Sequence, residues 1–288
     1  MNNLLEELTV SANNEKIQKP NFNTKIGREF LAFYLLTKFR QVIAYDKRAE
    51  KQLLVDIKHD FLSNFLKRLI NRPEDRILIA LTGESASGKT TICDAIKESI
   101  ERLNLPVSIL NADNYFNDIS DLIKVHGTFD ALRDAGYDID APESFQLDLL
   151  RDDLIKLSKG IDIKAPKYLV NGTGISVPNE VLVQSKKIIV VEGMCSLYNN
   201  LDELFDIKVY VEIPDKMREK RFMDRAQSRN QDMDNARRHW KYVKEAGEKY
   251  VRTFRDKCEI IASGECDLGY FADILEYLKI ITNNFQEG

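Results

Sequence analysis

The fold follows from Ile77-Leu-Ile-Ala-Leu-Thr-Gly83-Glu-Ser-Ala-Ser-Gly88-Lys89-Thr90, in which an apolar run leads into a glycine-rich turn. The apolar run is too short for a helix and is typical of a buried parallel strand. The turn matches the phosphate-binding pattern G-x-x-x-x-G-K-[ST] in full, and a helical stretch follows it up to Leu103. Because the pattern requires a strand before it and a helix after it, we interpret residues 83–90 as a P-loop.

The residues of this P-loop are suited to hold the phosphates of ATP. Its two glycines allow successive backbone N–H groups to face one anion, and the start of the following helix adds a partial positive charge. Lys89 is expected to reach the β- and γ-phosphates, and the Thr90 hydroxyl is expected to bind Mg²⁺. The predicted nucleotide-binding residues are Gly83, Glu84, Ser85, Ala86, Ser87, Gly88, Lys89, Thr90 and Thr91.

Short apolar runs and helical stretches alternate through the rest of the chain. Further strands are predicted at 107–110, 188–191, 207–211 and 259–262, and helices near 145–158, from 216 onward and at 270–281. Such alternation indicates an α/β domain with a parallel sheet flanked by helices, whose ligands bind beyond the carboxyl ends of the strands. We therefore expect a P-loop NTPase fold over residues 76–288.

The first 75 residues carry a helical pattern instead. Apolar residues such as Phe30, Phe33 and Ile57 recur at helical spacing between residues 25 and 72. We predict two or three amphipathic helices that form an N-terminal extension over residues 1–75. Their expected role is packing on the main domain, with partner binding or dimerisation as the alternative.

The composition excludes several classes of protein. A net charge of −4 and a pI near 5.6 give no overall attraction to nucleic acid or to an anionic membrane. No apolar run is long enough to span a membrane, and the acidic start of the chain lacks the features of a signal peptide. The scattered cysteines predict free thiols in a reducing compartment, so we expect a cytoplasmic protein. These cysteines are Cys93, Cys195, Cys258 and Cys266.

Acidic residues follow two of the predicted strands. Asp113 comes just past the strand at 107–110, where a carboxylate can accept the proton of an attacking hydroxyl and also orient Mg²⁺. Glu192 follows the strand at 188–191, at the place of a metal-binding acid of the Walker B type. The chain contains neither the guanine-reading N-K-x-D sequence nor the L-S-G-G-Q of transporter ATPases. The pattern therefore favours a phosphotransferase.

A basic segment lies towards the C-terminus. Residues 216–258 contain 14 Lys and Arg against 7 Asp and Glu, a net charge of about +7 in an acidic chain. Arg221, Arg225 and Arg229 are spaced to share one helix face. We interpret residues 216–256 as a helical lid that closes over ATP and neutralises developing phosphate charge, with a solvated charged face as the alternative. The segment lacks the aromatic interleaving of a nucleic-acid-binding surface.

The motifs from about residue 76 to residue 281 resemble those of the uridine kinase / phosphoribulokinase / pantothenate kinase family, most closely the uridine kinase branch. The P-loop occurs in the family's order with three further landmarks and with a segment that is similar to the family's P-x-Y sequence. These are Asp113-Asn-Tyr-Phe116, Ile139-Asp-Ala-Pro-Glu-Ser-Phe145, Val190-Val-Glu-Gly193 and Ala165-Pro-Lys-Tyr168.

The resemblance implies an ATP- and Mg²⁺-dependent kinase that phosphorylates a hydroxyl of a small molecule, with a nucleoside as the first expectation. It implies that Asp113 is the catalytic base, that Glu192 helps to bind Mg²⁺, and that lid arginines act on the phosphate. The predicted catalytic residues are Asp113, Lys89, Arg221 and Arg225, and the predicted metal ligands are Thr90, Glu192 and Asp113. The predicted substrate-binding residues are Asp140, Tyr168, Tyr115 and Arg229.

The chain departs from the uridine kinase pattern where that pattern has two histidines. Thr173 stands about where a His follows the P-x-Y tyrosine, and Ala141 replaces the His of the family's F-D-H-P sequence. A pocket without these hydrogen-bonding partners would discriminate poorly between bases. A pantothenate kinase-like or a sugar- or glycerate-type kinase is therefore an alternative, and a non-catalytic ATP-binding regulatory protein is an alternative of another class. Expected partners are ATP and the acceptor, without nucleic acid or membrane; a homo-oligomer is left open.

Overall fold

The computed structural model describes residues 56–57 and 75–265, which fold around one six-stranded sheet. Five of its strands lie side by side and run parallel. In spatial order they are β8 (Ile260–Ser263), β7 (Ile207–Glu212), β2 (Ile77–Thr82), β6 (Ile188–Glu192) and β3 (Val107–Asn111). The predicted parallel α/β architecture is confirmed, and each predicted strand lies within one or two residues of its expected bounds.

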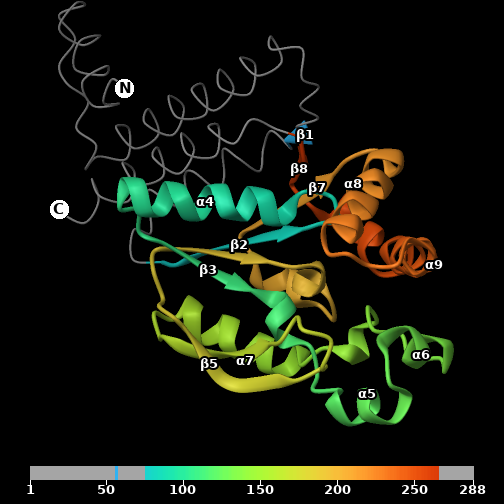
Figure 1. Ribbon diagram of the computed structural model, residues 1–288. Helices are drawn as coiled ribbons and strands as arrows, with labels where there is room; N and C mark the ends of the chain where they lie inside the picture. The colour runs from blue at the N-terminus through green and yellow to red at the C-terminus, as the bar shows by residue number, and fades with distance from the viewer. Residues whose placement is uncertain (1–55, 58–74, 266–288) are drawn as a thin grey trace, which may run out of the picture.

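The central strands are apolar because both faces of the sheet are covered. All five residues of β6 are buried, and β2 is buried at all but one position. Helix α4 (Lys89–Leu103) covers one face, while α7 (Leu147–Ser158) and the hairpin β4 (Ile163–Tyr168) and β5 (Ser176–Val183) lie on the other (Figure 1). Because both faces of the sheet are packed in this way, the carboxyl ends of the strands are held in a fixed direction.

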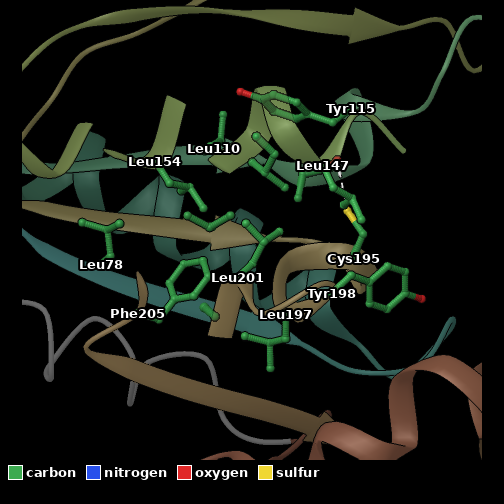
Figure 2. Close-up of a cluster of buried hydrophobic side chains, with 14 of the residues drawn as sticks. Leu78, Leu110, Tyr115, Leu147, Leu154, Cys195, Leu197, Tyr198, Leu201 and Phe205 are labelled. Atoms are coloured by element: carbon green, nitrogen blue, oxygen red, sulfur yellow. Dashed lines mark hydrogen bonds between the residues drawn. The ribbon is translucent and has the colours of Figure 1, made fainter. Parts of the chain in front are cut away.

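The main core lies between α7 and the sheet (Figure 2). Helix α7 buries Leu147, Leu150, Leu154 and Leu157, which share one face at helical spacing. They pack in one cluster with sheet residues that include Leu78, and the short helices η3 (Met194–Leu197) and η4 (Leu201–Leu204) complete it. This apolar layer packs against the carboxyl ends of β3 and β6 on the face of the sheet that α7 covers.

The sixth strand, β1 (Asp56–Ile57), comes from the predicted N-terminal extension. It pairs antiparallel with β8, so that Asp56 lies opposite Ile261 and Ile57 opposite Ile260. The prediction of a helix at Ile57 is therefore wrong, because the edge of β8 offers unpaired backbone groups that a strand can satisfy. The rest of the predicted extension and the predicted helix at 270–281 lie outside the described residues.

Two helical segments project beyond the carboxyl edge of the sheet (Figure 1). One follows β3 and consists of η1 (Ala112–Tyr115), α5 (Ser120–His126), α6 (Phe129–Asp134) and η2 (Pro142–Ser144). The other follows β7 and corresponds to the predicted lid, a name we keep for it. It consists of α8 (Asp215–Ser228), α9 (Met233–Ala246), the π-helix η5 (Gly247–Val251) and η6 (Arg252–Lys257). Among the described helices, none combines the length and the apolar character needed to cross a membrane.

Candidate active site

The P-loop curls between β2 and α4 as the sequence predicts. Gly83 has φ +146°, and a Cβ there would lie 2.3 Å from the carbonyl oxygen of Val211, so no larger residue fits. Helix α4 begins at Lys89 without a side-chain cap at Gly88, which leaves its first N–H groups available to an anion. The Lys89 ammonium donates to the carbonyl oxygens of Gly83 (2.7 Å) and Glu84 (3.1 Å).

Asp113 lies in η1, directly after β3, and faces the P-loop. Its Oδ1 atom is buried and has no hydrogen-bond partner among the described residues. Burial raises the pKa of the Asp113 carboxyl, while the charge of Lys89 and the Met194 backbone N–H act to lower it. A buried carboxylate oxygen without a partner is uncommon in folded proteins and indicates a group that a ligand completes.

Gly193 makes room for this carboxylate. Its φ is +154°, and a Cβ there would lie 2.9 Å from Asp113 Oδ1 and 2.8 Å from the Ala112 Cβ. The glycine after β6 therefore permits the close approach of η1 to the end of that strand.

Glu192 ends β6 and lies opposite Asn111 on β3 and Leu81 on β2. Its side chain is buried, and burial together with the charge of Asp113 raises the pKa of Glu192 to about 7, against the opposing effect of Lys89. The ends of three neighbouring strands thus bring the P-loop and both acids to one place. They line a cleft of about 290 Å³ whose walls are Ser85, Ala86, Gly88, Lys89, Thr90, Thr91, Asp113, Glu192, Arg221, Arg225 and Gly264.

The oxygen donors of this cleft fit Mg²⁺. The described residues contain no group of three or more His, Cys, Asp or Glu that could hold a metal by itself. Mg²⁺ does not need such a group, because it binds one or two carboxylates and completes its coordination with water and substrate phosphates. The Thr90 hydroxyl and the carboxylates of Asp113 and Glu192 are hard ligands of this kind, and the unpartnered Asp113 Oδ1 has free capacity for a cation.

The lid contributes two of the three predicted arginines to the cleft. Arg221 and Arg225 line it from α8, and Arg221 donates to the carbonyl oxygen of Gly264 at 3.3 Å. Arg229 ends α8, is exposed, and does not line the cleft. Its predicted role in substrate binding therefore has no counterpart in this arrangement.

Glu84 belongs to the P-loop, but its carboxylate faces the lid. It accepts from Arg218 Nη1 at 2.7 Å and from Arg252 Nη2 at 3.1 Å, and Tyr210 adds a longer bond at 3.4 Å. Three of the predicted nucleotide-binding residues do not line the cleft; they are Gly83, Glu84 and Ser87. The arginines at 218 and 252 were missed by sequence reasoning, because no local signal marks them.

A second cavity of about 230 Å³ lies between the α6 segment and the lid. Burial raises the pKa of the Asp140 carboxyl to about 6; Arg133 acts to lower it, and Asp138 and Asp113 to raise it further. Asp140 belongs to the same segment after β3 as Asp113, which lines the cleft. Its lining residues are Arg133, Gly136, Tyr137, Asp138, Asp140, Tyr242, Glu245, Ala246 and Lys249. We call this space the Asp140 cavity.

The two tyrosines predicted to bind substrate line neither cavity. Tyr168 is partly buried and its ring packs against Phe116, with centroids 5.1 Å apart. Tyr115 is fully buried, and its hydroxyl donates to Asp153 of α7 at 2.8 Å. A side chain enclosed in the core does not reach an acceptor, so the predicted substrate contact of Tyr115 is corrected to a structural role.

Comparison with known proteins agrees with this site. The model of the phosphoribulokinase / uridine kinase family matches residues 78–265. A uridine kinase from Clostridium novyi (strain NT) is 37% identical over 144 residues, which are 49% of this chain and 64% of the relative. Uridine-cytidine kinase B from Dictyostelium discoideum is 28% identical over 187 residues, 64% of this chain and 73% of the relative.

The chain covers a smaller share of some longer relatives. The chain spans 36% of a uridine kinase from Saccharomyces cerevisiae (strain ATCC 204508 / S288c), with 30% identity over 193 residues, or 65% of this chain. A crystal structure from Silicibacter sp. TM1040, assigned as a fructose transport system kinase, shares the fold with a TM-score of 0.52 at 20% identity. It covers 70% of this chain and 93% of its own. Because the family model spans the P-loop, both acids and the lid, the chain belongs to the phosphoribulokinase / uridine kinase family.

Proposed function

We propose that the chain is an ATP- and Mg²⁺-dependent kinase that transfers the γ-phosphate to a hydroxyl of a nucleoside, as uridine kinases do. One observation carries this proposal: the buried, unpartnered Oδ1 of Asp113 lies in the same cleft as Lys89 and Glu192. Membership of the family and the names of the relatives support both the reaction and the class of acceptor.

Asp113 accepts the proton of the acceptor hydroxyl in this proposal. A carboxylate whose pKa is raised by burial holds a proton better than an exposed one, which suits a general base near neutral pH. Lys89, Arg221 and Arg225 direct their donors at the γ-phosphate oxygens, where charge develops during transfer. Thr90, Asp113 and Glu192 hold Mg²⁺, which when bound neutralises charge on the β- and γ-phosphates.

The acceptor lies with its hydroxyls at Asp140, which lines the second cavity and follows Asp113 in the segment after β3. Closure of the lid over both spaces excludes water, so that the γ-phosphoryl group passes to the acceptor hydroxyl, with ADP as the leaving group, rather than to water. We place the reaction in the cytoplasm, because the cysteines are scattered through the sequence without the close pairs of a disulfide framework or a zinc site, a pattern that suits a reducing compartment.

The substitution Asp113→Asn tests the proposal. It keeps the shape of the side chain and removes the base, so we expect kcat with uridine to fall by about 10²- to 10⁴-fold while the Kd for Mg·ATP changes little. ADP release in a coupled assay and calorimetric titration with a non-hydrolysable ATP analogue measure the two quantities. Asp152→Asn, on the exposed face of α7, is the matched control and is expected to keep full activity.

Two outcomes would contradict the proposal. If the Asp113→Asn variant had the same kcat as the wild type, Asp113 would not be the general base. ADP release by the wild type that does not respond to any nucleoside, pantothenate, glycerate or pentose phosphate would instead favour an ATP-binding protein without turnover.

A further inference from the structure

Beside the Asp140 cavity, Arg133 places a buried nitrogen without a hydrogen-bond partner in the described part of the chain. It lies in the last turn of α6, its side chain is only 9% exposed, and it lines the cavity. Its Nη1 atom is buried and has no hydrogen-bond partner among the described residues. The Asp130 carboxylate is 4.0 Å away, beyond hydrogen-bonding distance.

This orphaned nitrogen can be satisfied only by an oxygen or nitrogen that accepts. A guanidinium group offers donors and no acceptor, and it keeps its charge at any physiological pH. Neighbouring groups do not supply the acceptor: the Tyr242 ring lies 5.9 Å from Cζ, and Tyr242 donates its own hydroxyl to Asp134. Arg133 lines the cavity together with Tyr242, Glu245 and Ala246 of α9, and this position suits an acceptor atom that a bound molecule brings.

The other charged groups around the cavity indicate the charge of the molecule that it can bind. The cavity is lined by three carboxylates (Asp138, Asp140 and Glu245) and by two cations (Arg133 and Lys249). The Lys249 side chain is 66% exposed to solvent and pairs with Asp138 at 3.8 Å. An anionic acceptor such as a hydroxy acid or a sugar phosphate would meet like charge at Asp140 and Glu245, which disfavours it. A neutral molecule with hydroxyls for Asp140 and an accepting oxygen for Arg133 is complementary to both groups.

We propose that Arg133 is a specificity-determining residue that donates to a carbonyl oxygen of a neutral polyhydroxy acceptor whose hydroxyls lie at Asp140. A pyrimidine nucleoside has both features, since its sugar hydroxyls donate and its base carbonyls accept. This inference rests on the proposed function and names the group that selects the acceptor.

The test compares Arg133→Met, Arg133→Lys and the wild type with uridine as the probe. Loss of a hydrogen bond to a charged group predicts that KM for uridine rises by about tenfold to hundredfold in Arg133→Met. We expect kcat to change less, the Kd for Mg·ATP to stay the same, and Arg133→Lys, which retains a donor, to recover part of the loss. Arg151→Met on α7 is the matched control and is expected to behave as the wild type.

Thermal melting separates recognition from a structural role. Arg133→Met removes a buried charge that has no close partner, so its melting temperature without ligand is expected to equal or exceed that of the wild type. A melting temperature far below the wild type, with weaker binding of Mg·ATP, would identify a structural residue and overturn the inference. An unchanged KM for uridine in Arg133→Met would overturn it as well.

Failure of the inference and failure of the proposed function give different results. If the wild type phosphorylates glycerate or a pentose phosphate but no nucleoside, kinase activity stands and the role of Arg133 is overturned. If no acceptor stimulates ADP release, the proposed function fails, and calorimetry of uridine binding with Mg·ADP decides the inference alone. Binding by the wild type that Arg133→Met loses supports it, and equal binding or none overturns it.

Discussion

Glu84 occupies the second position of the P-loop, yet it acts on the lid rather than on the nucleotide. Its carboxylate pairs with Arg218 at 2.7 Å and with Arg252 at 3.1 Å, and Arg218 also bonds Asp215 at 2.9 Å. Arg218 is fully buried and lies 5.3 Å from the centre of the Trp240 ring. The phosphate-binding loop and the base of the lid are thus joined through one charged network.

Replacement of Glu84 by Gln is expected to destabilise the fold. Breaking a buried ion pair by removing one partner leaves Arg218 inadequately paired, which predicts a loss of about 3 kcal/mol in the free energy of unfolding. Urea denaturation measures it. The control is Glu212→Gln, whose pair with Arg255 (2.7 Å) is half-exposed, so that its loss is expected to cost about 1 kcal/mol or less. Equal effects of the two substitutions would contradict a network that depends on burial.

Residues that follow strands could be predicted from the sequence, and residues held by distant partners could not. Asp113 and Glu192 were found because each directly follows a strand beside the P-loop, and parallel strands end at the same edge. Arg218 lies 134 positions from Glu84 and Arg252 lies 168 positions from it, so only the fold brings them together. Arg133 was missed for the same reason, because nothing local distinguishes it from a solvated arginine.

At the scale of elements, the lid has a small core of its own that contains a titratable group. Phe222 of α8 packs against Trp240 of α9 with ring centroids 5.4 Å apart, and His239 meets Phe222 edge-on at 5.3 Å. Burial lowers the pKa of His239 to about 4, with the charge of Arg133 and Arg225 acting in the same direction and Asp130 against it. The folded lid therefore resists protonation of this imidazole.

The stability of the lid is expected to fall in acid. Between pH 6.5 and about 4 the unfolded segment binds a proton at His239 that the folded lid does not, so the free energy of opening decreases as the pH falls through this window. Hydrogen exchange of α9 amides at pH 7 and pH 5, corrected for intrinsic rates, measures it. His239→Gln is expected to abolish this difference, whereas His126→Gln on the exposed end of α5 retains it. The same pH response in all three proteins would argue against the assignment.

Elements with plain periodicity were predictable, and irregular ones were not. The strands and helices α4 and α7 begin and end close to their expected residues, and α8 begins at Asp215, one residue before its expected start. The hairpin β4–β5 was missed because Pro166, which breaks the register between Ala165 and Lys167, reads as a signal against a strand. The π-helix η5 was missed as well, because its extra residue per turn leaves no periodic signal of its own.

At the scale of the whole molecule, the lid contacts the segment that contains α6 beside the Asp140 cavity. Tyr242 donates to Asp134 at 3.1 Å and Tyr250 donates to Asp138 at 2.8 Å. Both bonds cross between segments that are more than a hundred positions apart in the sequence. Both bonds must break before the lid can move away from this segment, so opening of the lid is expected to limit turnover.

Solvent viscosity tests this expectation. The wild-type kcat is expected to fall in proportion to relative viscosity in sucrose, because opening of the lid is a diffusive motion. The double substitution Tyr242→Phe and Tyr250→Phe removes both bonds and is expected to lower this dependence. Polyethylene glycol of high molecular mass, which raises bulk viscosity without slowing small motions, is the control. A wild-type rate that does not respond to sucrose would show that chemistry limits turnover.

The pairing of β1 with β8 has a consequence for synthesis of the protein. Asp56 lies opposite Ile261, so this edge closes a loop of about two hundred residues, which is entropically unfavourable and slow to form. The residue after β8, Gly264, touches the P-loop so closely that a Cβ there would lie 1.7 Å from the carbonyl oxygen of Ser87. Because Gly264 also lines the cleft, a nascent chain completes this wall of its phosphate site only after residue 264 has left the ribosome.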